Sequence, residues 1–180
     1  MAESIRRNAH LLLYERNGRW ITMSIRINTL WKVPAFCVVA GFFTYSMAFY
    51  GLRKLAIVSL PDGSVAMDDT RVLLLYGALF VGTVLLGGLV FFRHMTRKEL
   101  LLSASIVALY RVVLLLVQWS LRDTAGPSAI WMLYLLRPFE WCSFLSQVGF
   151  MVSNAHWISI ILEVLSPYLF VSFGKKEEAT

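Results

Sequence analysis

Five long runs of apolar residues dominate this chain of 180 residues, and short charged segments separate them. The runs cover residues 34–52, 72–92, 100–121, 129–152 and 157–173. Most have about 20 residues, the length of helix that spans a hydrocarbon layer roughly 30 Å thick. Lipid cannot satisfy backbone polar groups, so a spanning segment is a helix or part of a closed barrel, whose strands alternate. The runs do not alternate, so the sequence predicts about five transmembrane helices.

The composition is typical of a membrane-embedded chain. Hydrophobic residues make up 58% of the sequence and charged residues 16%, too few to cover a soluble globule. Charges continue from Arg16 to Lys32 before the first apolar run, unlike the brief basic start of a cleaved signal peptide. We expect an all-α integral membrane protein with a membrane-surface segment at 1–33, a transmembrane domain at 34–174 and a polar tail at 175–180.

The basic residues predict the orientation in the membrane. They flank the apolar runs and do not form a basic face rich in aromatic residues, so we expect no nucleic-acid partner. Five crossings with a cytoplasmic N-terminus place nine basic residues inside and six outside, and put the chain ends on opposite sides. If residues 129–152 re-enter instead of crossing, the counts become eleven and four. Both counts favour a cytoplasmic N-terminus in a plasma (inner) membrane.

The N-terminal thirty residues show a period of two. Asn17-Gly18 favours a two-residue type I′ hairpin turn, and apolar and polar residues alternate from Ile21 to Ile27. The turn predicts two opposed pairs, Tyr14 with Ile21 and Leu12 with Met23. An interfacial amphipathic helix over residues 5–16 is the alternative. In either form we expect this segment to rest on the bilayer, on the helices or on a partner.

Four charged residues interrupt the last three apolar runs. They are Arg111 in the third run, Arg137 and Glu140 in the fourth, and Glu163 in the fifth. A charge at the centre of a spanning helix costs about 2.5–3.5 kcal/mol, so we expect all four to face the interior. Residues seven apart share a helix face, which adds Gln118 and Gln147. The sequence predicts a polar ligand- or ion-binding site formed by these six residues.

Pro138 predicts a kink or break in the fourth helix. It cannot donate a hydrogen bond to the carbonyl of Tyr134, and it disfavours helical geometry at Arg137. Glu140 would then lie in the first turn of a half-helix, where the helix dipole favours a negative charge. Broken helices near the middle of the membrane form polar binding sites in transporters.

Two classes of function remain open. In the first, the protein binds or transports a small polar solute or ion, because arginines suit an anionic group and glutamates a cation or proton. In the second, it is a non-catalytic accessory subunit of a membrane complex or homo-oligomer. Its small-residue pairs Ala78/Gly82 and Thr83/Gly87 are typical of close helix packing.

Enzymatic chemistry has less support in the sequence. The histidines lie outside the apolar runs, and no serine or cysteine nucleophile has a histidine near it. Cys37 and Cys142 lack metal-ligand spacing, and the three aspartates between 62 and 69 lack the spacing of a calcium loop. We expect no metal and no cofactor.

Overall fold

The computed structural model describes residues 8–14, 20–59, 61, 63–121, 128–153 and 155–175. Within these ranges, four helices are long and apolar enough to cross a membrane. They are α2 (Lys32–Gly51), α3 with η2 (Asp69–Leu86 and Gly87–Phe91), α4 (Arg97–Ser120), and α7 with η4 (His156–Leu165 and Ser166–Phe173). The predicted all-α membrane-type architecture is therefore present, with four long helices among the described residues where about five were predicted.

The fourth apolar run accounts for the difference. It is divided into α5 (Ser128–Leu136), the 3-10 helix η3 (Arg137–Cys142) and α6 (Ser143–Ser153). The predicted break is confirmed, and it begins directly before Pro138, which removes one backbone donor and disfavours helical geometry at the preceding residue. Pro167 likewise lies at the start of a 3-10 helix, η4, and the sequence predicted no change of helix type there.

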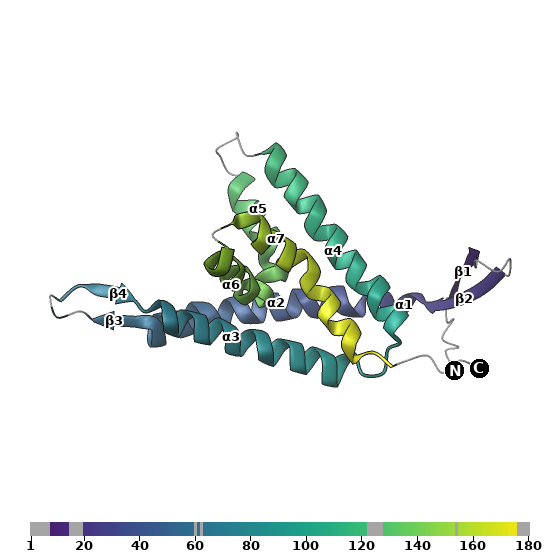
Figure 1. Ribbon diagram of the computed structural model, residues 1–180, viewed down its shortest axis with the longest axis horizontal. Helices are drawn as coiled ribbons and strands as arrows, with labels where there is room; N and C mark the ends of the chain where they lie inside the picture. Colours follow the sequence, from purple (N-terminus) through teal and green to yellow (C-terminus); the bar gives the residue numbers. More distant parts are fainter. Residues whose placement is uncertain are drawn as a thin grey trace, which may run out of the picture.

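The long helices form a wedge that the broken segment fills. The helices α2 and α3 run antiparallel, whereas α4 and α7 are inclined to them, with α5 and α6 in the space between (Figure 1). α1 (Ile27–Leu30) lies at the narrow end of the wedge. There the Ser103 hydroxyl of α4 donates to the Leu30 carbonyl and accepts a hydrogen bond from the Val33 N–H. One side chain thus joins the start of α2 to the start of α4.

The 3-10 helix η3 packs directly on α2 at Gly41, near the middle of that helix. A Cβ atom at Gly41 would overlap the carbonyl oxygen of Arg137 and lie 2.8 Å from the Cα of Pro138. The buried residues of α2 are all valine-sized or smaller: Val33, Cys37, Ala40, Gly41, Thr44 and Ala48. This small-residue face lets the backbone of η3 approach closely.

Aromatic side chains hold η3 against the other long helices. Phe139 stacks on Tyr110 of α4 with ring centroids 6.0 Å apart. Trp141 stacks on Phe80 of α3, also at 6.0 Å, and its ring lies 5.3 Å from that of Phe170 in η4. Phe139 and Trp141 are nearly inaccessible to solvent, so η3 is the centre of the helical bundle.

The C-terminal end of η4 lies beside the loop that precedes α4. The Lys175 N–H donates to the Met95 carbonyl at 3.0 Å, and the Arg97 N–H donates to the Lys175 carbonyl at 3.2 Å. A full crossing by residues 129–152 would have placed Lys175 at the opposite end of the bundle. The described end of η4 thus agrees with the re-entrant alternative, because the broken segment returns to the end of the bundle at which it entered. The two chain ends themselves, which the prediction placed on opposite sides of the membrane, lie outside the described residues.

A β-hairpin forms near the N-terminus, as the alternation predicted. β1 (Asn8–Tyr14) pairs antiparallel with β2 (Trp20–Arg26), so the alternative of a helix over 5–16 is wrong. The predicted register is also wrong by one residue, because Tyr14 lies opposite Trp20 and Leu12 opposite Thr22. Five residues lie between the two strands, whereas the predicted turn has two. The predicted turn residues Asn17-Gly18 lie outside the described residues.

A second hairpin follows α2 at the opposite end of the bundle. The π-helical turn η1 (Leu52–Ala56) leads into β3 (Ile57–Ser59), which pairs with β4 (Val65–Met67). Gly63 has a φ of 80°, which glycine adopts without strain. This hairpin extends beyond the ends of the helices (Figure 1).

Replacing Gly41 with alanine should destabilise the protein, because the added methyl group meets the backbone of η3. We expect a loss of about 1–3 kcal/mol, the usual cost of overpacking. Gly82→Ala is the matched control, since it makes the same helical substitution where a Cβ meets nothing within 4 Å. Thermal unfolding in detergent should show a lower Tm for Gly41→Ala only. Equal Tm values would show that the close packing of η3 on α2 is not required.

Candidate functional site

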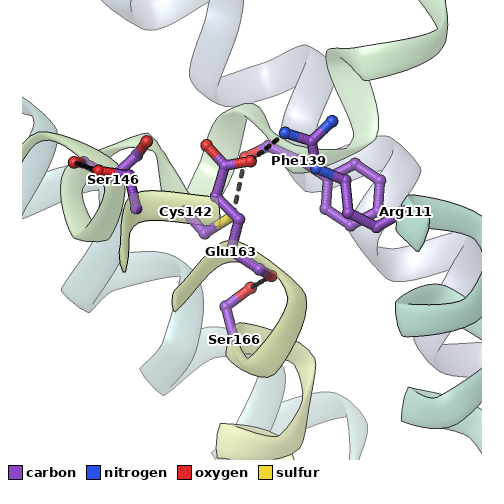
Figure 2. Close-up of polar contacts among 7 residues, drawn as sticks. Arg111, Phe139, Cys142, Ser146, Glu163 and Ser166 are labelled. Carbon is purple, nitrogen blue, oxygen red and sulfur yellow. Dashed lines mark hydrogen bonds and ion pairs between the residues drawn. The ribbon is translucent and has the colours of Figure 1, made fainter. Parts of the chain in front are cut away.

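An ion pair joins α4 and α7 beside η3. The Arg111 Nη2 group donates to Oε2 of Glu163 (Figure 2). The Arg111 side chain is only 8% exposed and that of Glu163 16%, so both charges are largely removed from solvent. In such surroundings the attraction between the charges is strong, and so is the cost of leaving either of them unpaired.

Arg111 has more donors than the structure satisfies. Its Nε and Nη1 atoms are buried and have no hydrogen-bond partner among the described residues. Its guanidinium carbon lies 5.4 Å from the centre of the Phe139 ring, which provides a cation–π contact but no hydrogen-bond acceptor. Buried polar groups are normally hydrogen-bonded, so unpaired N–H groups on a buried arginine favour an acceptor from outside the described chain.

Three hydrogen bonds from side chains to backbone carbonyls lie around the ion pair. The Ser166 hydroxyl donates to the Glu163 carbonyl at 2.7 Å, where α7 gives way to η4, and the Cys142 thiol donates to the Phe139 carbonyl at 2.9 Å (Figure 2). The Ser159 hydroxyl of α7 donates to the Ser146 carbonyl of α6 at 2.8 Å. The Ser159–Ser146 contact joins α7, which carries Glu163, to α6, whereas the other two hydrogen bonds lie within single segments.

Arg137 and Glu140, the two charges of η3, have different neighbours. The guanidinium carbon of Arg137 lies 3.1 Å from the centre of the Tyr45 ring of α2. The Glu140 carboxylate interacts with the Tyr76 hydroxyl of α3. The structure thus arranges all four predicted charges around η3 but pairs Arg111 with Glu163.

The two glutamines lie apart from the charged residues. Gln118 is exposed near the end of α4, and Gln147 is half-buried in α6. Neither is hydrogen-bonded to the four charged residues in the part of the chain that the structure describes. The break at η3 explains the position of Gln147, because a seven-residue spacing marks one face only when the helix is continuous.

Three polar residues of α2 and α3 were not among those predicted from the sequence. Tyr45 and Tyr76 contact the charges of η3, and Thr44 has a buried Oγ1 with no partner among the described residues. All three are polar residues within apolar runs. That signal was available, but their helical positions alone did not show which of them face η3.

Neither a protein-family model, a curated protein nor a solved structure matches this chain. The possible functions therefore depend on the geometry of the site.

Removing one charge of the ion pair should cost more stability than removing both charges. Glu163→Gln leaves the buried Arg111 uncompensated, and we expect a loss of about 3–5 kcal/mol. Arg111→Met/Glu163→Gln should recover much of that loss, because no unpaired buried charge remains. Chemical or thermal unfolding of the purified variants measures the difference.

Glu140→Gln is the control for this comparison. Glu140 is only half-buried and forms no direct ion pair among the described residues, so Glu140→Gln should lose less stability. If the double variant is as unstable as Glu163→Gln, the energetic coupling between Arg111 and Glu163 is absent.

Proposed function

We propose that this protein binds or transports a small polar solute or ion at the Arg111–Glu163 site within the membrane. The observation that carries the proposal is the buried arginine with unpaired Nε and Nη1 atoms. An intramembrane ionisable residue has a high insertion cost, and such residues mark solute or ion pathways.

The chemistry of the site favours a solute that offers oxygen acceptors. A carboxylate, phosphate or sulfate oxygen could accept hydrogen bonds from the free N–H groups of Arg111, as guanidinium groups commonly do. Glu163 already balances one positive charge, so a single anionic group would leave the pair with one net negative charge. Glu140, on the same 3-10 helix, provides a carboxylate for a cationic group or proton.

A purely structural role explains the ion pair less well. Buried ion pairs contribute little net stability compared with apolar residues of similar volume. Aromatic and apolar side chains also join α4, η3 and η4, and these contacts need no buried charge. The incomplete hydrogen bonding of Arg111 also argues against a site optimised only for stability.

The position of Lys175 supports an orientation with the N-terminus in the cytoplasm of a plasma (inner) membrane. Lys175 adjoins the loop that carries Arg93, and Arg97 begins the following helix at the same end. Among the described residues, that end holds six basic residues and the opposite end three: Arg26, Lys32, Arg93, Arg97, Lys98 and Lys175 against Arg53, Lys54 and Arg71. The positive-inside rule then places the richer end in the cytoplasm.

The second candidate function is that of an accessory subunit in a membrane complex or homo-oligomer. The β3–β4 hairpin favours it, because Val65 and Met67 are 70% and 55% exposed there. A two-stranded hairpin is only marginally stable alone, and a partner could cover these side chains. Stoichiometric copurification with another membrane protein, without solute binding, would favour this function.

Solute binding by the purified protein tests the first proposal. We expect at least one of phosphate, sulfate, acetate and glutamate to raise the Tm, since a ligand that binds only the folded state stabilises it. Arg111→Met/Glu163→Gln should fold but lose this increase.

The control variant Arg71→Met/Asp69→Asn removes one charge of each sign from the exposed start of α3 and should keep the response to solute. Solute-dependent stabilisation that survives in Arg111→Met/Glu163→Gln would contradict the assignment of the site. For a solute that does bind at the site, its flux into proteoliposomes distinguishes transport from binding.

A further inference from the structure

An apolar groove lies between α2 and α3. Its volume is about 730 Å³, within the range of roughly 300–1,000 Å³ that is typical of ligand sites. Phe36, Val39 and Phe43 of α2 form one wall, and Ala78, Leu79 and Gly82 of α3 form the other. The groove is separate from the charged residues of the candidate site, none of which lines it.

The small-residue pairs Ala78/Gly82 and Thr83/Gly87, which lie in α3 and at the start of η2, have different environments. A Cβ at Gly87 would lie 2.8 Å from the rings of Phe36 and Phe170, so this glycine is already used in packing within the chain. A Cβ at Gly82 would meet nothing within 4 Å. The Ala78/Gly82 pair therefore leaves open space along the groove.

One end of the groove is positively charged. Lys32, in the first turn of α2, is the charged residue that lines it, and its side chain is exposed. Arg93 directly follows Phe92, which also lines the groove, and it is exposed as well. Neither residue forms an ion pair within the described part of the chain. Both cations are thus available to an anion at the membrane surface.

We infer that this groove binds an anionic phospholipid, with an acyl chain between α2 and α3 and the phosphate beside Lys32 and Arg93. The apolar walls match the acyl chain, and the unpaired cations at the groove end match the negative headgroup. Basic pockets at the cytoplasmic ends of transmembrane helices bind anionic headgroups in this way. A zwitterionic lipid could fill the groove but would lack the net charge that these cations complement.

Lipid titrations of the purified full-length protein test this inference. Phosphatidylglycerol and phosphatidylcholine with identical acyl chains are added in detergent, and the Tm is measured against lipid concentration. We expect phosphatidylglycerol to bind more tightly. Lys32→Gln should weaken that binding about fivefold, the effect of removing one basic residue near a charged surface.

Two further variants separate the headgroup from the acyl chain. Lys54→Gln removes an exposed lysine just beyond the opposite end of α2 and should leave the preference for phosphatidylglycerol unchanged. Gly82→Leu fills the groove and should weaken the binding of both lipids. Soluble glycerol phosphate, which has no acyl chain, should not reproduce the stabilisation.

Three results would overturn the inference. The first is equal stabilisation by the two lipids, and the second is an unchanged preference in Lys32→Gln. The third is that Gly82→Cys forms a disulfide-linked dimer in bilayers and that the protein shows no preference between the two lipids. That dimer would show that a second copy of the chain occupies the groove.

Discussion

The close packing of η3 on Gly41 of α2 is the contact on which the rest of the structure depends. Only a residue without a Cβ leaves space for the Arg137 carbonyl, and Pro138 prevents the chain from continuing as an ordinary α-helix at that point. The broken segment therefore reaches the middle of the bundle, where its aromatic residues contact α3, α4 and η4. A break in a membrane-type α-helix is tolerated where protein surrounds it in this way.

The position of η3 also determines the electrostatics of the interior. Phe139 lies under the Arg111 guanidinium, so the ring occupies a place where an acceptor could otherwise stand. Arg111 is left with one carboxylate partner and unpaired N–H groups. Arg137 and Glu140 point to aromatic residues of α2 and α3. Among the described residues the interior thus contains four charges and one direct ion pair between them.

The sequence predicted the membrane-type helices, the break at Pro138 and the four central charges because each depends on a local property. The length of an apolar run and the geometry imposed by a proline are properties of one segment. A charged residue in an apolar run must face away from lipid whatever the rest of the fold is. The choice of Glu163 as the partner of Arg111 depends on how α7 packs against α6 and η3, which no local pattern encodes. The course of residues 129–152 likewise depends on Gly41, nearly 100 residues away.

Single-cysteine labelling tests the central claim that the broken segment enters and leaves at the same end of the bundle. Cys37 and Cys142 are replaced by alanine, and one cysteine is introduced at His94, Lys175 or Val65. A membrane-impermeant maleimide is then added to vesicles of uniform orientation. The structure predicts that positions 94 and 175 are labelled from one side and position 65 from the other. Labelling of position 175 together with position 65 would contradict it, because residues 129–152 would then cross the membrane completely.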